Sequence, residues 1–328
     1  MRRMRSKFLG GFLSLLIATL VVWEGQAQSQ QAYPTRPIDL VVPVAVGGST
    51  DLVGRIMANA LSKKWGSPIN VLNKPGGNYI PGMLYVYEAQ PDGYTMMMEA
   101  NSQSSLFVLV KNLPFKIMDR TFIGRMAFAP QVFIVGSKTP FKSLGELAEE
   151  AKRNTANFSL SWNGDGTDTT GLATRQFFKA INVDIRKVRV VSASGGGQGL
   201  ILTAGGNVIL SVPTLTTGVA GLQAGTVRGL AITAPKRNRD WPNIPTTAEA
   251  GFPTVTMGWR GEISGPPKLP PFVVEKWEKG MEEILRDPAV IAQLDKLGLT
   301  VSYLNSKETR ETVLKEIDEV WDIWSEVK

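Results

Sequence analysis

The segment Tyr33–Asp51, YPTRPIDLVVPVAVGGSTD, decides how this chain is expected to fold. Its apolar run Ile38–Val44 predicts a buried strand that enters a Gly-Gly turn, and apolar residues at helical spacing follow the turn. Ser49 or Thr50 is the expected N-cap of that helix. The turn would then direct unpaired backbone N–H groups and the positive end of a helix beyond the strand, which favours binding of a carboxylate or a phosphate.

The first 27 residues have the pattern of a secretory signal peptide. Four basic residues precede the apolar run Phe8–Val22, which is too short to span a bilayer comfortably, and small residues lead to an expected cleavage site after Ala27. The alternative is an uncleaved N-terminal anchor. A lipoprotein is excluded because the chain has no cysteine to acylate. The mature chain is therefore expected in the periplasm.

The composition narrows the function classes. Removing residues 1–27 takes away four basic residues and one acidic residue, so the net charge falls from +7 to +4, and nucleic acid is a poor partner for such an exported chain. The chain has no cysteine and no histidine. These absences exclude a thiol nucleophile, a Ser-His-Asp triad and a His- or Cys-ligated metal site. We therefore expect no enzyme, no cofactor and no metal.

Strand-like and helix-like segments alternate along most of the remaining 300 or so residues, which suffice for two domains. The alternation predicts an α/β fold with mostly parallel sheets, whose ligands bind beyond the carboxyl ends of the strands. Ser143 and Glu146 form a capping-box pattern that predicts a helix start. A proline-rich stretch, 240–271, leads into C-terminal helices, and the apolar stripe of the last one predicts a helix docked on a sheet.

Further motifs follow the opening segment in order: Asn73–Gly76 (NKPG), Pro91–Thr95 (PDGYT), Leu222–Ala231 (LQAGTVRGLA), Trp241–Gly251 (WPNIPTTAEAG) and Gly258–Gly261 (GWRG). With these motifs, nearly all of the mature chain resembles the Bug solute-binding receptors, the extracytoplasmic components of tripartite tricarboxylate transporters. The resemblance implies a periplasmic-binding-protein type II-like Venus flytrap, in which two α/β lobes close over a small organic acid. It implies one lobe from residues 28–128 plus 255–328 and a second lobe from 129–254.

The resemblance also implies a binding site on two facing sets of loops. In the first lobe, the ligand loop would comprise Gly47, Gly48, Ser49, Thr50 and Asp51, with Asn73, Asn101 and Ser102 after the next two strands. In the second lobe, the candidates are Ser161, Trp162, Asn163, Gly164, Asp165, Gly166 and Thr167, with Gly195 and Gly196 at the next strand-to-helix turn.

Several of these residues have two interpretations. Asp51 either stabilises the first turn of a helix or contacts ligand. Trp162 either stacks on an aromatic ligand or packs in the core, and Tyr79 is either core or a wall of the site. Asp165 would repel a second ligand carboxylate unless it points away. The glycines at 195–197 do not indicate a dinucleotide site, because no Asp or Glu occurs between Arg186 and Arg239.

The sequence thus predicts a monomeric periplasmic receptor that delivers a small organic acid to a membrane permease. Two alternatives remain: a receptor that reports its ligand to a histidine kinase, and an exported enzyme that uses Asp51, Asp165 or Glu99. The sequence does not name the ligand, and malate, tartrate, adipate-like, aromatic dicarboxylate and amino-acid ligands all stay open.

Overall fold

The computed structural model describes residues 32–193 and 195–325, so the predicted signal peptide and its cleavage site lie outside the described residues. From Arg36 onwards the described chain forms one compact unit. Its elements are built around two separate β-sheets. None of the described helices combines the length and the apolarity needed to cross a membrane.

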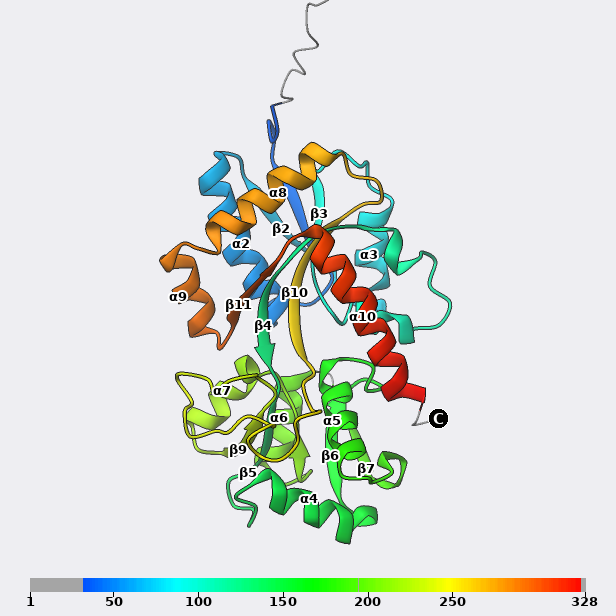
Figure 1. Ribbon diagram of the computed structural model, residues 1–328, viewed down its shortest axis with the longest axis vertical. Coiled ribbons are helices and arrows are strands. Elements are labelled where there is room, and N and C mark those ends of the chain that lie inside the picture. Colours follow the sequence, from blue (N-terminus) through cyan, green and yellow to red (C-terminus); the bar gives the residue numbers. More distant parts are fainter. Residues whose placement is uncertain (1–31, 194, 326–328) are drawn as a thin grey trace, which may run out of the picture. The chain divides into compact units, whose positions relative to one another are not determined.

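A six-stranded sheet and four helices form the part that we call the first lobe (Figure 1). The strand order is β11-β4-β10-β3-β1-β2. Strand β1 runs parallel to β2 and β3, whereas β10 is antiparallel to β3 and β4, and β11 is antiparallel to β4. The strands are β1 (Ile38–Val42), β2 (Ile69–Asn73), β3 (Thr95–Ala100), β4 (Thr121–Pro130), β10 (Gly258–Gly265) and β11 (Thr300–Leu304). The helices are α2 (Ser49–Trp65), α3 (Ile80–Tyr87), α8 (Pro271–Ile284) and α9 (Pro288–Lys296), with short 3₁₀ turns η1 (Gly77–Tyr79), η2 (Ser105–Leu109) and η3 (Ile117–Asp119).

A five-stranded sheet with its helices forms the second lobe. The strand order is β7-β6-β8-β5-β9; β6 is parallel to β7 and β8, and β5 is antiparallel to β8 and β9. The strands are β5 (Val132–Gly136), β6 (Ser159–Asn163), β7 (Arg189–Ala193), β8 (Leu210–Ser211) and β9 (Val227–Ile232). The helices are α4 (Leu144–Arg153), α5 (Thr169–Ala180), α6 (Gly196–Ala204) and α7 (Leu215–Gln223), with 3₁₀ turns η4 (Thr155–Asn157) and η5 (Ile185–Lys187).

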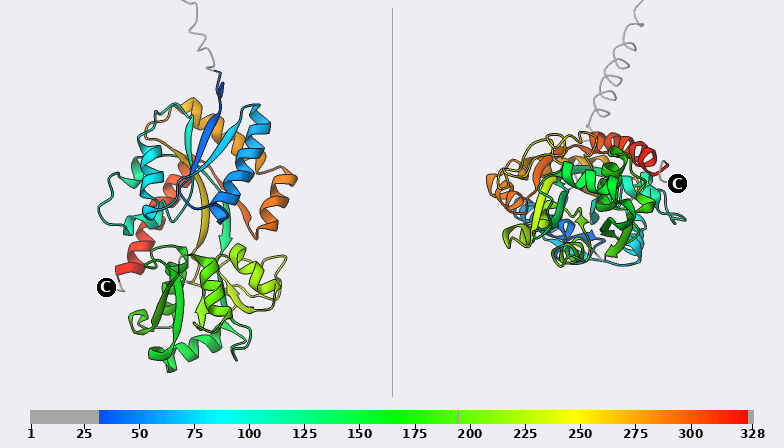
Figure 2. Two further views of the ribbon diagram at one scale, coloured as in Figure 1. Left: turned by 180° about the vertical axis from the view of Figure 1, so that it is seen from behind. Right: turned by 90° about the horizontal axis from the view of Figure 1, so that it is seen from below.

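Both sheets are mixed, so the expected parallel pairing holds only for the strands away from the crossings between the lobes. The chain enters the second lobe where β4 leads through Gln131 into β5, and it returns through β10 (Figure 2). The crossing strands therefore pair antiparallel with their neighbours: β10 with β3 and β4, and β5 with β9. Gln131 is fully buried, and its backbone amide donates to Thr233 Oγ1 over 2.9 Å. The predicted domain ranges stay a prediction.

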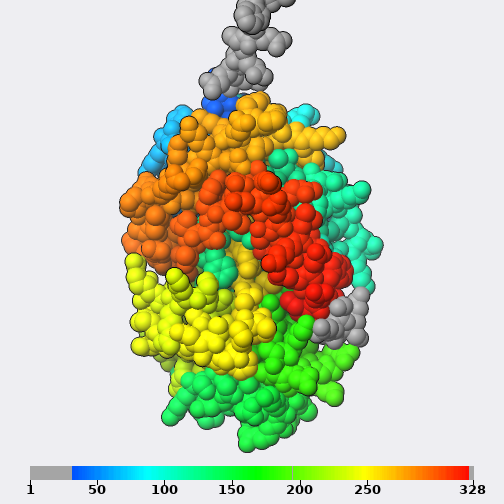
Figure 3. Space-filling model, viewed as in Figure 1, coloured from blue at the N-terminus to red at the C-terminus, as the bar shows by residue number. Residues whose placement is uncertain are grey.

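The last helix, α10 (Ser306–Ser325), packs on β4 of the first lobe and also contacts α5 of the second lobe. Figure 3 shows this helix, in red, lying across one face of the unit. Val313 and Val320 of the predicted apolar stripe are fully buried, whereas Trp321 is 42% exposed. Glu316 from the same helix accepts from Arg125 over 2.9 Å at a buried position. The helix is therefore fastened to the sheet by both apolar and ionic contacts.

Local sequence signals explain much of this architecture. The predicted start of α4 at Ser143 is confirmed, because Ser143 Oγ accepts from the amide of Glu146 over 3.1 Å. The second bond of the capping box is shifted by one residue, since the Glu146 carboxylate accepts from the amide of Lys142 over 2.7 Å. Strand β3 places Met96, Met97 and Met98 at fully buried positions. These methionines therefore belong to the core of the first lobe.

Candidate functional site

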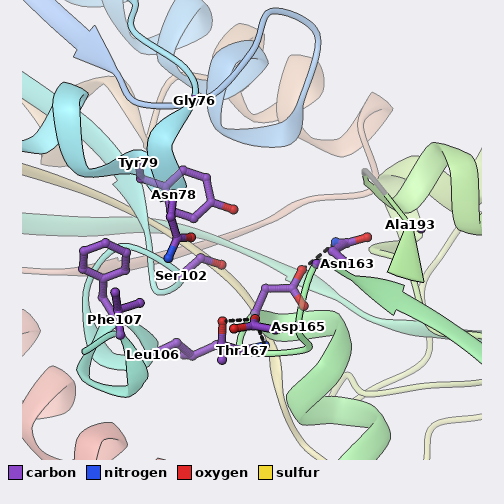
Figure 4. A pocket seen from close by; sticks show the side chains of 13 residues that line it. Gly76, Asn78, Tyr79, Ser102, Leu106, Phe107, Asn163, Asp165, Thr167 and Ala193 are labelled. Atoms are coloured by element: carbon purple, nitrogen blue, oxygen red, sulfur yellow. Dashed lines mark hydrogen bonds between the residues drawn. The ribbon is translucent and has the colours of Figure 1, made fainter. Parts of the chain in front are cut away.

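A cavity of about 250 Å³ lies between residues of the two lobes (Figure 4). The first lobe contributes Gly76, Asn78, Tyr79, Ser102, Leu106, Phe107 and Val110, and the second lobe contributes Asn163, Gly164, Asp165, Thr167, Asp168 and Ala193. We call it the interlobe cavity. Of the residues predicted from the sequence, it brings together Ser102, Asn163, Gly164, Asp165 and Thr167.

The second-lobe wall of this cavity is the loop between β6 and α5, and its own side chains hold it in shape. Asp165 Oδ1 accepts from both the amide and the hydroxyl of Thr167, over 3.1 and 2.7 Å. Asn163 Nδ2 donates to Asp168 Oδ2 over 2.5 Å. Asp168 also caps α5, since its Oδ1 accepts from the amide of Gly171 over 3.0 Å. A carboxylate of the chain thus already occupies the start of α5.

The interlobe cavity is acidic, because none of the described residues that line it is Lys or Arg while Asp165 and Asp168 both face it. Burial raises the pKa of the Asp168 carboxyl above its usual value, although its hydrogen bonds act in the opposite direction. Burial, together with the negative charges of Asp168 and Asp165, raises the pKa of Tyr79 to about 12. The negative potential of the second lobe therefore reaches Tyr79 on the first lobe.

The first-lobe loop after β1 is organised by Asp51, whose side chain points inward. Asp51 is fully buried; its Oδ2 accepts from the Gly47 amide over 2.9 Å and from Arg55 Nε over 3.1 Å, and its Oδ1 accepts from Asn73 Nδ2 over 2.8 Å. Burial alone would raise the pKa of Asp51, but these hydrogen bonds and the Arg55 charge lower it below its usual 3.8. This arrangement favours the structural interpretation of Asp51.

The helix after this loop begins differently from the prediction. Gly48, in an extended conformation, is the N-cap of α2 and no side chain caps the helix, so the assignment of Ser49 or Thr50 as N-cap is wrong. The reason is that the Asp51 carboxylate holds the Gly47 amide, and the helix begins directly after Gly48. Within the described chain, the amides of residues 48–51 have no hydrogen-bond acceptor. The positive end of α2 is thus unsatisfied by protein.

The hydroxyls of this first turn differ in their surroundings. Thr50 is buried, and its Oγ1 accepts from Trp259 Nε1 over 3.3 Å, which leaves its own hydrogen available to donate. Ser49 is half-buried. Residues 47–51 are not among the residues that line the interlobe cavity.

The side chains of Asn73 and Asn101 form hydrogen bonds with other residues of the protein. Asn73 Nδ2 donates to the Val44 carbonyl over 3.1 Å as well as to Asp51, so it fixes the loop after β1. Asn101 is fully buried; its Nδ2 donates to the Gly258 carbonyl over 2.9 Å, and its Oδ1 accepts from the Arg260 amide over 3.1 Å. Asn101 therefore ties the end of β3 to β10, near the crossing between the lobes.

Three second-lobe candidates, Ser161, Trp162 and Gly166, are not among the residues that line the interlobe cavity. Ser161 is buried, with its hydroxyl against that of Ser211 beneath α6. Trp162 lines a different cavity, where its ring lies 4.7 Å from the Arg175 guanidinium. Gly166 has φ +75°, and a Cβ at this position would lie 2.7 Å from the Trp162 ring. Gly166 and Trp162 therefore pack against each other.

The remaining two candidates lie at the start of α6. Gly195 is the N-cap residue, with extended backbone, and its carbonyl accepts from the amides of Gln198 and Gly199 over 3.0 and 3.2 Å. Gly196 is the first residue of the helix, and a Cβ there would lie 3.3 Å from Pro213 and Thr217. Close packing of α6 against α7 therefore accounts for the small residue at 196.

Sequence reasoning missed part of the cavity wall: Gly76, Asn78, Leu106, Phe107, Val110, Asp168 and Ala193. Asp168 had a readable signal, because an Asp three residues before a helical amide is an N-cap pattern. For Tyr79, the sequence allowed either a core position or a wall of the site; it lines the cavity, with its ring 6.2 Å from that of Phe107. Asn78 and Tyr79 reach it through positive φ angles of 50° and 69°, which composition and periodicity do not predict.

Two of the three carboxylates considered for catalysis, Glu99 and Asp51, are engaged outside the interlobe cavity, whereas Asp165 lines it. Glu99 is fully buried in the first-lobe sheet and pairs with Arg120, and Asp51 pairs with Arg55 over 3.0 Å. In the described part of the chain, no group of three or more Cys, His, Asp or Glu residues has the geometry to hold a metal ion.

A larger groove, of about 840 Å³, lies among β4, β10, β11 and residues 233–256, in the hollow visible below the orange and red helices in Figure 3. Its arginines already have carboxylate partners: Arg237 pairs with Glu249 over 2.8 Å, Arg239 with Asp295 over 3.6 Å, and Arg260 with Glu316 over 3.3 Å.

Two α/β lobes joined by crossing strands, with a cavity between them, define the class of type II periplasmic binding proteins, and solved structures similar to the chain, which include a periplasmic transporter and the periplasmic binding protein BugD, have this fold. Within that class, the chain belongs to the tripartite tricarboxylate transporter family of receptors, whose family model matches residues 53–327. The resemblance read from the sequence motifs is confirmed. The family and its structural neighbours are solute-binding receptors rather than enzymes.

Individual relatives agree with this assignment. Protein BugT of Bordetella pertussis is 26% identical over 296 residues, which are 88% of this chain and 88% of BugT. The structure of the periplasmic binding protein BugD is 27% identical, with a TM-score of 0.77 over 90% of this chain and 98% of BugD. MatC from Rhodopseudomonas palustris, solved with bound malate, is 25% identical, with a TM-score of 0.76 over 89% of this chain and 99% of MatC.

Proposed function

We propose that this protein is a periplasmic receptor that captures a small organic acid between its lobes and delivers it to a tripartite tricarboxylate-type membrane permease. The observation that carries the proposal is the interlobe cavity, whose wall comes from both lobes of a chain in this receptor family. A ligand that touches both walls binds the closed arrangement better than an open one, so closure reports occupancy. The relative MatC binds malate, a small organic acid.

We expect the acid group at the first turn of α2, whose residues are not among those that line the interlobe cavity. The unsatisfied amides of residues 48–51, the Ser49 hydroxyl and the Thr50 hydroxyl form a set of donors at the positive end of a long helix. Asp51 does not oppose an anion there as strongly as its charge suggests, because Arg55 neutralises it within the loop. Each donor to a carboxylate in a dry cleft is worth roughly 1.5–3 kcal/mol.

The other end of the ligand meets a different environment. Asp165 and Asp168 would repel a second carboxylate, whereas Asn163 and Thr167 offer neutral polar atoms. We therefore favour a monocarboxylate whose distal end donates hydrogen bonds, such as a hydroxyl, an amide or an ammonium group, over a dicarboxylate. A preference for aromatic acids has no support from Trp162, which lines another cavity.

The test is a thermal-shift screen of the mature protein against small carboxylates, followed by calorimetry with the best binder. One or a few acids should raise the Tm, as binding linkage requires. Replacing Ser49 and Thr50 together by Ala should lower affinity by at least roughly 100-fold, since two hydroxyl contacts to a charged group are lost. Ser143→Ala is the matched control, because it removes a helix-cap hydroxyl on α4 and should leave affinity unchanged.

Unchanged affinity in the double variant would refute the assignment of the acid group to α2. The partner needs a separate measurement, because a permease and a histidine kinase would both read the same closed form. A pull-down with the ligand-saturated receptor should retain permease subunits, and retention of a kinase ectodomain alone would favour the sensory alternative.

A further inference from the structure

A second cavity, of about 300 Å³, contains a buried cation that the receptor function does not use. Its walls come from β6, α5, η5, β7 and the end of α10, and Arg175 of α5 lies in it. Arg175 is 7% exposed. Neither a hydrogen-bond acceptor nor an ion-pair partner of Arg175 occurs within residues 32–193 and 195–325, and its buried Nε atom is unsatisfied.

Two indole rings are the main neighbours of this guanidinium group. The Arg175 Cζ atom lies 4.7 Å from the ring centroid of Trp162 and 4.4 Å from that of Trp324. Such contacts attract a cation through the ring faces but satisfy none of its N–H donors. Burial lowers the pKa of Arg175, and the charge of Asp165 acts in the opposite direction. The positive charge is therefore only partly compensated by protein.

The rest of the cavity wall is apolar apart from one arginine. Ile185, Val188 and Val190 complete the surface with the two indoles. The second arginine, Arg186, has its charge balanced by Asp184, whose carboxylate accepts from Arg186 over 2.8 and 2.9 Å. Arg175 is thus the lining group whose charge calls for an anion, and the cavity volume is at the lower end for small-molecule sites.

We propose that this cavity is a second binding site, distinct from the interlobe cavity, that takes a small monocarboxylate with a flat apolar body. The carboxylate accepts hydrogen bonds from the Arg175 guanidinium, as planar Arg–carboxylate pairs do. The apolar body lies among the indoles and the valines. Because Trp324 belongs to α10 and the other walls to the second lobe, an occupant contacts both.

Benzoate is a suitable probe, and tryptophan fluorescence is a suitable readout because two indoles line the cavity. The titration uses a protein that already carries Ser49→Ala and Thr50→Ala, so that failure of the proposed receptor site does not affect the result. Benzoate should bind saturably in the millimolar range or tighter, and neutral benzamide roughly tenfold more weakly. Benzoate should also raise the Tm of this protein.

Arg175→Gln should weaken benzoate binding by roughly 10- to 100-fold and abolish the shift in Tm. Arg189→Gln is the matched control, since Arg189 lies on β7 outside the cavity lining and donates to the Asn207 carbonyl. Equal binding of benzamide and benzoate, or unchanged benzoate binding by Arg175→Gln, would overturn the proposal. The proposal would also be overturned if Arg175→Gln and Glu326→Gln lowered the Tm equally and the double variant lowered it no further, because the anion would then be the carboxylate of Glu326, which lies outside the described residues.

Discussion

Replacing Asp51 by Ala should destabilise the protein through the loop after β1. The change removes a fully buried carboxylate and leaves the Gly47 amide and one N–H of Asn73 Nδ2 without an acceptor, at about 1 kcal/mol each. It also removes the pair with Arg55, which we count at no more than about 1 kcal/mol because the Arg55 side chain is 47% exposed. The expected loss is about 2–3 kcal/mol, or about 4–10 °C in Tm.

Calorimetry and denaturant unfolding of the ligand-free protein measure this loss. Asp318→Ala is the control, because it removes an exposed aspartate from α10 and should change the Tm little. Asp51→Asn keeps one acceptor oxygen and should lose less than Asp51→Ala. A Tm of Asp51→Ala close to that of the parent, combined with lost ligand affinity, would contradict the structural role and assign Asp51 to the ligand.

The same carboxylate gives a pH dependence whose sign follows from its lowered pKa. Because the folded-state pKa of Asp51 is below its usual 3.8, the carboxylate stabilises the folded chain above that pH. The contribution is lost as the pH falls through the folded-state pKa. The stability difference between the parent and Asp51→Asn should therefore shrink in acid, and a constant difference would contradict the assignment.

Three further changes have expected outcomes. Glu316→Gln should lower stability by about 3 kcal/mol, because it leaves the buried Arg125 with one carboxylate partner fewer; a loss below about 1 kcal/mol in urea unfolding would contradict this. Gly166→Ala should cost at least about 1–2 kcal/mol, since φ is +75° and the added Cβ would overlap the Trp162 ring; an unchanged Tm would refute it. Replacing Asp165 and Asp168 together by Asn should lower the pKa of Tyr79 from about 12. The pKa is measured by absorbance, and the Tyr79 signal is identified as the part of the titration that is absent in Tyr79→Phe. An unchanged pKa would show that the charges of these aspartates do not act on Tyr79.

The alternation of apolar segments was sufficient to predict an α/β chain and most of its elements. Whether neighbouring strands pair parallel or antiparallel could not be predicted in the same way. Strands β4 and β10 pair antiparallel because of how the chain crosses between the lobes, and the local sequence pattern does not encode this. The helix starts likewise divide into one that the local sequence predicts and one that it does not. Ser143 caps α4 as its local sequence predicts, whereas α2 begins at Ser49 because the Asp51 side chain folds back on Gly47.

The second-lobe wall of the cavity was predictable from the strand-to-helix turn at Asn163–Thr167, since a loop at the carboxyl end of a strand meets the cleft. The first-lobe wall was not. Leu106 and Phe107 reach the cavity on a 3₁₀ turn, and Tyr79 reaches it from a left-handed backbone conformation, so tertiary packing places all three. The cation in the second cavity could not be predicted either, because only the fold brings the Trp162 and Trp324 rings to Arg175.

The most direct test of the receptor hypothesis is a crystal structure of the mature protein with the acid that most raises its Tm. We predict that the unaltered acid lies between the lobes, with its carboxylate within hydrogen-bonding distance of the amides of residues 48–51 and its other end against Asn163 and Thr167. A ligand bound outside the interlobe region, or one recovered in chemically changed form, would contradict it.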